Sequence, residues 1–228
     1  MQYIRKNHTP PIEWNEWFTT KEGNRSFDYK EDYNKLRLVK NARQFLLDEQ
    51  KGLCAYCQSS LTLEKSSIEH IIPKTFNKEL STNYHNLVAV CRQPVVDESG
   101  RSHCDKERGD SILTPLILHT SMATSLKRNH AYFKATASGE LLPKEGLDKA
   151  TESQVKSFIE VLNLNHTGLK VARKNRLDAL LVVTRDGGIK GAKLKLFWEQ
   201  KFHYYYQREN EPYRQFLLIY LSTKLGRN

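Results

Sequence analysis

The sequence has no long apolar segment, and this absence excludes several classes of protein. No hydrophobic run approaches the roughly 20 residues that a transmembrane helix needs. The opening residues, Met1–Lys6, lead into tryptophans and charged residues rather than an apolar stretch, so we expect no signal peptide. Internal repeats and low-complexity tracts are also missing. These absences predict a soluble cytoplasmic protein with no membrane partner.

A second absence concerns nucleotide chemistry. The sequence contains no phosphate loop of the G-x-x-x-x-G-K-[ST] type, and the glycines and lysines of residues 187–193 have the wrong spacing for one. We therefore expect any ATP chemistry to belong to a partner protein.

Basic residues are distributed unevenly along the 228 residues of the chain. Residues 1–110 hold 17 Lys and Arg against 16 Asp and Glu, whereas residues 111–228 hold 19 against 10. The second half thus carries nearly all of the net charge of +10. Such an excess suits binding to nucleic acid, because each neutralised phosphate releases counterions. A solubilising surface of scattered lysines is the alternative.

All four cysteines lie in one segment of the chain. Cys54 and Cys57 form a C-x2-C pair, and twelve residues separate Cys91 from Cys104. In a reducing compartment this pattern is more typical of zinc ligands than of disulfides. Four thiolates would leave Zn²⁺ no open coordination position, so we expect a structural metal site. His103 is an alternative fourth ligand, and a lone C-x2-C pair with two unrelated thiols is another reading.

Acidic residues and a histidine stand between and beside these cysteines. Glu69 and His70 are adjacent, and Asp105 directly follows the last cysteine. His70 is the natural general base, since an imidazole titrates near neutral pH. Glu69 and Asp105 would bind a hard divalent ion such as Mg²⁺ or Mn²⁺ through oxygen. Neighbouring residues of a strand point to opposite sides, so Glu69 and His70 converge only if the strand bends or ends there.

Three further residues are candidates for the same site. We expect the Asn86 amide to brace the loop that carries His70, and Arg108 to contact the scissile or an adjacent phosphate. His85 is a candidate substrate contact because it precedes Asn86. Each residue alone has a structural explanation: a lone histidine is more often structural, and Asp105 could cap a helix. Their joint order favours a nuclease.

Hydrophobic spacing predicts how these residues are arranged. A helix over residues 33–50 should end at Gly52, and short strands are expected over 66–71 and 86–91. A helix should begin after Cys104, which gives a strand–loop–strand–insertion–helix unit.

The rest of the chain is expected to be mostly helical. The pattern predicts a hairpin over residues 131–142, helices around 155–162 and over 167–183, and an aromatic-rich segment over 194–225 that Pro212 interrupts. Trp14 and Trp17 are expected to dock on the protein's own core. We expect core or interface roles for the three tyrosines of residues 204–206, rather than base stacking.

Over about residues 50–110 the chain resembles the zinc-stapled HNH, or ββα-metal, endonucleases. The resemblance lies in the four cysteines and in the segments Glu69-His70-Ile71-Ile72-Pro73, Asn86-Leu87 and Cys104-Asp105. The resemblance implies an α+β fold, with a small ββα-metal HNH core and a four-cysteine zinc site embedded in a mainly helical protein. It implies a base role for His70, metal roles for Glu69 and Asp105, and a positioning role for Asn86. Asp105 replaces the family's final histidine, and a carboxylate favours Mg²⁺ or Mn²⁺ over softer metals.

The wider chain is similar to the PtuB family, the HNH subunits of bacterial Septu anti-phage systems, which also occur beside retrons. The similar segments are Met1–Lys6, Cys104–Asp110 and Leu162–Leu181. This resemblance implies an ABC/SMC-like ATPase partner (PtuA-like). In a retron setting it also implies a reverse transcriptase with its RNA and DNA.

Three regions follow from these patterns. Residues 1–50 are expected to form an N-terminal segment and helix, and residues 51–111 the HNH core with its zinc staple. Residues 112–228 are expected to form a basic, mostly helical domain for assembly and nucleic-acid binding. The leading hypothesis is a metal-dependent endonuclease in phage defence, with DNA favoured over RNA. The alternatives are a non-catalytic zinc-stapled binding module and a stand-alone restriction or homing nuclease.

Overall fold

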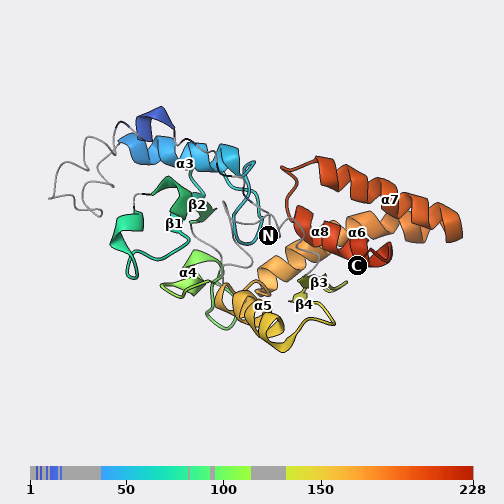
Figure 1. Cartoon of the computed structure of the whole chain (residues 1–228). Helices are drawn as coiled ribbons and strands as arrows, with labels where there is room; N and C mark the ends of the chain where they lie inside the picture. Colours follow the sequence, from blue (N-terminus) through green and yellow to red (C-terminus); the bar gives the residue numbers. More distant parts are fainter. Residues whose placement is uncertain are drawn as a thin grey trace.

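The computed structural model describes residues 37–81, 83–92, 96–113 and 132–227, together with positions 4, 6, 9, 11–14 and 16. Helices and two small sheets make a mixed α and β fold (Figure 1). The elements are α3 (Arg37–Glu49), β1 (Ser66–His70), η1 (Lys78–Ser81), η2 (Tyr84–Asn86), β2 (Leu87–Cys91), α4 (Asp105–Arg108), β3 (Phe133–Ala135), β4 (Leu141–Pro143), α5 (Lys149–Val161), α6 (Thr167–Asp186), α7 (Gly191–Gln207) and α8 (Arg214–Lys224).

The first sheet is the antiparallel pair of β1 and β2. The register runs from Ser66 opposite Cys91 to His70 opposite Leu87. Every residue of β2 is buried, as its uninterrupted apolar sequence predicts, and α3 packs against it. Both strands fall within one residue of their predicted bounds. Because β1 ends at His70, the site residues lie where the chain leaves the sheet.

One glutamine fixes β2 to the end of α3. Gln50 is buried, and its Nε2 donates hydrogen bonds to the carbonyls of Leu53 and Ala89, each at 2.8 Å. Its Oε1 accepts a hydrogen bond from the Ala89 N–H at 2.7 Å. The amide therefore pairs with the edge of β2 as a neighbouring strand would.

The hairpin of β3 and β4 appears where the sequence predicts it. Its turn contains Gly139 at φ +88°, a conformation that favours glycine. A Cβ atom at Gly139 would lie 2.1 Å from the carbonyl oxygen of Lys170 in α6. The glycine therefore allows the hairpin to approach α6 closely. Helices α5 and α8 pack on the same hairpin.

Helices α7 and α8 are separate elements on either side of the predicted break at Pro212. Arg214 donates hydrogen bonds to the carbonyls of Tyr205 and Tyr206, which satisfies the C-terminus of α7. Tyr204 and Tyr206 are 38% and 62% exposed, so a core role is wrong for these two tyrosines. Tyr205 is half-buried against the core.

The motif-bearing segment and the C-terminal helices share one hydrophobic core. Gln58 joins them, because its backbone carbonyl accepts from the Tyr213 N–H and its side-chain oxygen accepts from the Gln215 N–H, both at 3.0 Å. Trp14 is buried and packs edge-on against Tyr84 at 6.1 Å, whereas Trp17 lies outside the described residues. None of the helices that the structure describes has the length and apolar character to cross a membrane.

Replacing Gln50 with alanine should destabilise the fold by about 3 kcal/mol, because the Leu53 carbonyl, the Ala89 carbonyl and the Ala89 N–H each lose a buried hydrogen bond. Urea unfolding followed by circular dichroism measures this difference. Gln44→Ala is the matched control, because this exposed amide lies in α3 and donates to the Asp48 carboxylate on the same helix. Equal unfolding midpoints for the two variants would contradict the anchoring role of Gln50.

Candidate active site and metal cluster

Four cysteine sulfurs form one compact, buried group. Cys54 and Cys57 lie in the turn after α3, Cys91 ends β2, and Cys104 immediately precedes α4. Their Sγ atoms all lie within 4.8 Å of one another, with Cys54–Cys104 at 3.8 Å and Cys57–Cys91 at 3.6 Å. A tetrahedron of sulfurs bonded to zinc at about 2.3 Å has edges of about 3.8 Å. The cluster can therefore hold a metal such as zinc.

Without a bound metal, these buried thiols differ in pKa. Burial raises the pKa of Cys54 and of Cys104 well above the usual range. Hydrogen bonds from Cys104, Cys54 and Cys91 lower the pKa of Cys57 well below it. A buried thiolate needs nearby positive charge, and a bound divalent cation would supply it to all four sulfurs.

His103 supports this cluster from outside. Its Nδ1 lies 3.1 Å from the sulfur of Cys104, and its ring packs edge-on against His166 at 5.0 Å. Burial lowers the pKa of His103, so the neutral ring is favoured and can donate its Nδ1–H to the sulfur. The geometry fits four cysteine ligands with His103 as their hydrogen-bond partner, rather than His103 as a ligand.

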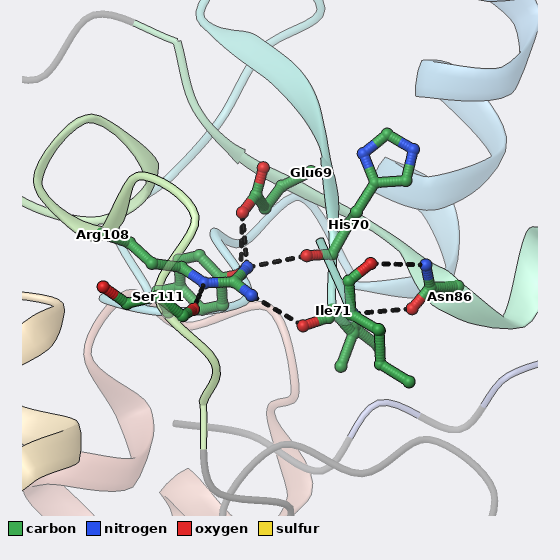
Figure 2. Close-up of polar contacts among 8 residues, drawn as sticks. Glu69, His70, Ile71, Asn86, Arg108 and Ser111 are labelled. Atoms are coloured by element: carbon green, nitrogen blue, oxygen red, sulfur yellow. Dashed lines mark hydrogen bonds and ion pairs between the residues drawn. The ribbon is translucent and has the colours of Figure 1, made fainter. Parts of the chain in front are cut away.

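His70 ends β1 with its ring held in one orientation. Its Nε2 lies 2.9 Å from the carbonyl oxygen of Ser81. A carbonyl can only accept a hydrogen bond, so Nε2 carries the proton and Nδ1 becomes the proton-accepting atom of the neutral ring. Burial lowers the pKa of His70, which favours that neutral form. The imidazole points away from Arg108 (Figure 2). This arrangement suits a general base.

Asn86 holds the loop that follows His70. Its Oδ1 accepts from the Ile72 N–H at 2.8 Å, and its Nδ2 donates to the Ile72 carbonyl at 3.0 Å (Figure 2). Its Nδ2 also donates to the carbonyl of Leu80 at 3.1 Å. The buried amide of Asn86, in η2, therefore holds two points of this loop, Ile72 and Leu80. These contacts are the bracing that the sequence predicts for Asn86.

Glu69 and Asp105 bring two carboxyl groups together. Asp105 is the first residue of α4, and it follows Cys104, whose backbone has φ +60°. Burial and then the neighbouring Asp105 carboxylate raise the pKa of Glu69 to about 8. Two adjacent carboxylates repel one another, and a shared divalent ion removes that repulsion. The donor set therefore fits Mg²⁺ or Mn²⁺ by its chemistry.

Arg108 occupies a different place from the one expected for a phosphate contact. Its side chain is fully buried and forms an ion pair with Glu69. The guanidinium also donates hydrogen bonds of 2.7 to 2.9 Å to four oxygens: the Tyr56 hydroxyl and the carbonyls of His70, Ile71 and Ser111 (Figure 2). A phosphate could reach this group only if these bonds broke. The geometry supports a positioning role, in which Arg108 fixes the end of β1.

Tyr56 is a site residue that sequence reasoning missed. It lies between the paired cysteines, is fully buried, and contacts both Arg108 and, at 3.5 Å, a carboxylate oxygen of Glu69. Burial raises its pKa well above the usual range, so it remains a neutral donor. The sequence feature that could have identified Tyr56 is the position of an aromatic residue between the two cysteines of the C-x2-C pair.

His85 is half-buried in the first turn of η2. Its backbone N–H donates to the side chain of Asn83 at 2.9 Å, and its ring packs edge-on against Tyr84 at 5.7 Å. The substrate contact expected of His85 stays a prediction.

Two curated proteins are similar to this chain. The proposed HNH endonuclease of retron Vc95, from Vibrio cholerae serotype O1 biovar El Tor, is 24% identical over 139 residues, which is 60% of this chain and 63% of that protein. The proposed HNH endonuclease of retron Ec83, from Escherichia coli, is 27% identical over 221 residues, 80% of this chain and 83% of that protein. Comparison with protein-family models finds no match. This chain thus spans less than two thirds of the Vc95 protein, and the two similarities support an HNH nuclease family.

Metal analysis of the purified protein should find one zinc per chain. Cys104→Ser should lower that ratio and the yield of folded protein, because metal binding and folding are coupled at a buried thiolate site. His103→Ala should leave the zinc ratio unchanged, since His103 is a hydrogen-bond partner of the Cys104 sulfur and not a metal ligand. Elemental analysis by mass spectrometry measures the ratio. Zinc lost from His103→Ala but retained in Cys104→Ser would make His103 the ligand.

Arg108→Lys should lower the free energy of unfolding by about 3 kcal/mol or more, because an ammonium group cannot replace the five contacts of the buried guanidinium. Lys106→Ala, on the exposed side of the same helix, is the control and should change little. Urea unfolding, together with the DNA affinity of the zinc-loaded protein without added Mg²⁺ or Mn²⁺, separates the positioning role from the phosphate contact. Unchanged stability with weaker DNA binding would instead support a direct contact between Arg108 and a phosphate.

Proposed function

We propose that this chain is a metal-dependent HNH endonuclease that hydrolyses phosphodiester bonds in nucleic acid, with DNA as the favoured substrate and RNA as the alternative. The observation that carries the proposal is the interaction of the Glu69 and Asp105 carboxyl groups, together with the ring of His70, the residue after Glu69, which its contact with Ser81 holds in one orientation. Similarity to two proteins named as HNH endonucleases supports the same conclusion. On this proposal β1, β2 and α4 are the ββα-metal core.

The residues divide the reaction between them. His70 takes a proton from the attacking water at Nδ1, while its bond to Ser81 keeps the ring in place. Glu69 and Asp105 hold Mg²⁺ or Mn²⁺. When bound, this ion supplies positive charge next to the phosphate and the leaving oxygen. Asn86 holds the loop beside His70, and His85 contacts the substrate.

In this proposal Zn²⁺ and Arg108 have structural rather than catalytic roles. Zn²⁺ in the four-cysteine cluster would be held by Cys54, Cys57, Cys91 and Cys104, which would leave it no open position for water or substrate. Arg108 orients the Glu69 carboxylate and the carbonyls at the end of β1. Both groups therefore act on catalysis only through the residues that they hold.

We further propose that the nuclease is the effector of a bacterial anti-phage system. The names of its relatives place those proteins with retrons, which supports a retron reverse transcriptase with its RNA and DNA as partners. The sequence has no phosphate loop, so an ABC/SMC-like ATPase subunit would supply any ATP chemistry. The basic region, residues 112–228, serves assembly and nucleic-acid binding.

His70→Ala should reduce metal-dependent cleavage by about a hundredfold to ten-thousandfold, because the base that activates water is lost. It should leave the nucleic-acid affinity of the zinc-loaded protein, measured without added Mg²⁺ or Mn²⁺, close to that of the wild type. The assay incubates the protein, alone and with the proposed ATPase partner, with plasmid DNA or total RNA in Mg²⁺, Mn²⁺ or EDTA. The degraded pool identifies the substrate.

His203→Ala serves as the matched control, because His203 is an exposed residue of α7 far from the site in sequence. It should cut like the wild type. Normal cutting by His70→Ala would show that the base is another group. Binding without cutting in every wild-type mixture would favour the zinc-stapled binding module instead.

A further inference from the structure

The turn between α5 and α6 contacts the segment that leads into Asp105. The Cys104 N–H donates to the carbonyl of Leu162 at 2.9 Å. One residue further on in the turn, the Asn163 Nδ2 donates to the carbonyl of Ser102 at 2.7 Å. These two bonds join chain positions about sixty residues apart in sequence, just before the first residue of α4.

Asn163 has a backbone conformation that few residues adopt. It follows the end of α5 with φ +43°, in the left-handed region that asparagine tolerates better than most other residues. Its backbone N–H bonds back to Glu160 at 3.0 Å. The conformation therefore ends the helix and directs the side-chain amide towards Ser102.

The direction of Asp105 depends on the backbone that these bonds hold. Cys104 has φ +60° and ψ −136°, and its carbonyl accepts the Arg108 N–H of α4 at 2.9 Å. A rotation of residues 102–104 would turn the start of α4, and with it the Asp105 carboxyl group. Zinc would fix the Cys104 sulfur, but the peptide groups on its N-terminal side need separate support.

We propose that Asn163 is a positioning residue that holds Asp105 in place to bind the catalytic divalent ion. The inference rests on the proposed function only in assigning that ion to Glu69 and Asp105. The helical region then contributes to the active site directly, because the turn after α5 supports one of the two carboxylates.

Asn163→Asp tests the inference with the smallest change. Aspartate keeps the shape and tolerates the same backbone conformation, but its carboxylate cannot donate to the Ser102 carbonyl. Mn²⁺ affinity of the zinc-loaded protein is measured by electron paramagnetic resonance, without substrate. We expect about tenfold weaker Mn²⁺ binding, at the low end of the loss seen when the support of a metal ligand is removed. Zinc content should stay the same.

Asn165→Asp is the control, because Asn165 is the same residue type two positions along the same turn. Its side chain exchanges two 2.8 Å hydrogen bonds with the backbone of Leu141 in β4, not with the segment before Asp105. The substitution removes one donor there as well. Asn165→Asp should therefore bind Mn²⁺ like the wild type. Asn163→Gly, which removes the donor without adding charge, should match Asn163→Asp.

Two results would overturn the inference while leaving the proposed function intact. One is wild-type Mn²⁺ affinity in both Asn163 variants. The other is an equal loss in the Asn165 control, which would reveal general loosening of the turn. A wild-type protein that binds no Mn²⁺, with Asp105→Asn behaving identically, would instead overturn the proposed ion site and this inference with it.

Discussion

The buried guanidinium of Arg108 is the contact on which the arrangement of the site depends. It joins three parts of the chain: the turn between the first two cysteines through Tyr56, the end of β1 through the carbonyls of His70 and Ile71, and α4, which carries it. A buried charge of this kind is tolerated only when it is paired and fully hydrogen-bonded. The ion pair with Glu69 meets that requirement and turns the carboxylate towards the helix that begins with Asp105.

The metal cluster and the carboxylates are linked through adjacent residues. Cys104 and Asp105 are neighbours in sequence. One peptide bond therefore joins a residue that would bind zinc to a residue proposed to bind the catalytic ion. Glu69, in turn, belongs to a strand paired with β2, which ends in Cys91. A structural metal would therefore fix the spacing of the two carboxylates without touching the substrate. The contacts of Asn163 and Leu162 add support from the helical region.

Local sequence patterns predicted the helices and strands better than they predicted the contacts that support the candidate site. Strand bounds, the short helix after Cys104 and the hairpin at Gly139 follow from apolar spacing and turn residues, which act over a few positions. The role of Arg108 does not, because charged side chains are rarely fully buried and its partners in β1 and the following loop lie 37 to 39 residues away. The contact of Asn163 spans 61 residues. The exposure of Tyr204 and Tyr206 was also unpredictable, since it depends on which face of α7 packs against α8.

The central claim is that Glu69 and Asp105 share a divalent ion beside a separate zinc cluster. The most direct measurement is anomalous X-ray diffraction from crystals of the zinc-loaded protein soaked in Mn²⁺, recorded at the manganese and zinc absorption edges. The account predicts a manganese peak between the two carboxyl groups and a zinc peak among the four sulfurs. A manganese peak elsewhere, or none at these carboxylates while zinc occupies its cluster, would contradict it.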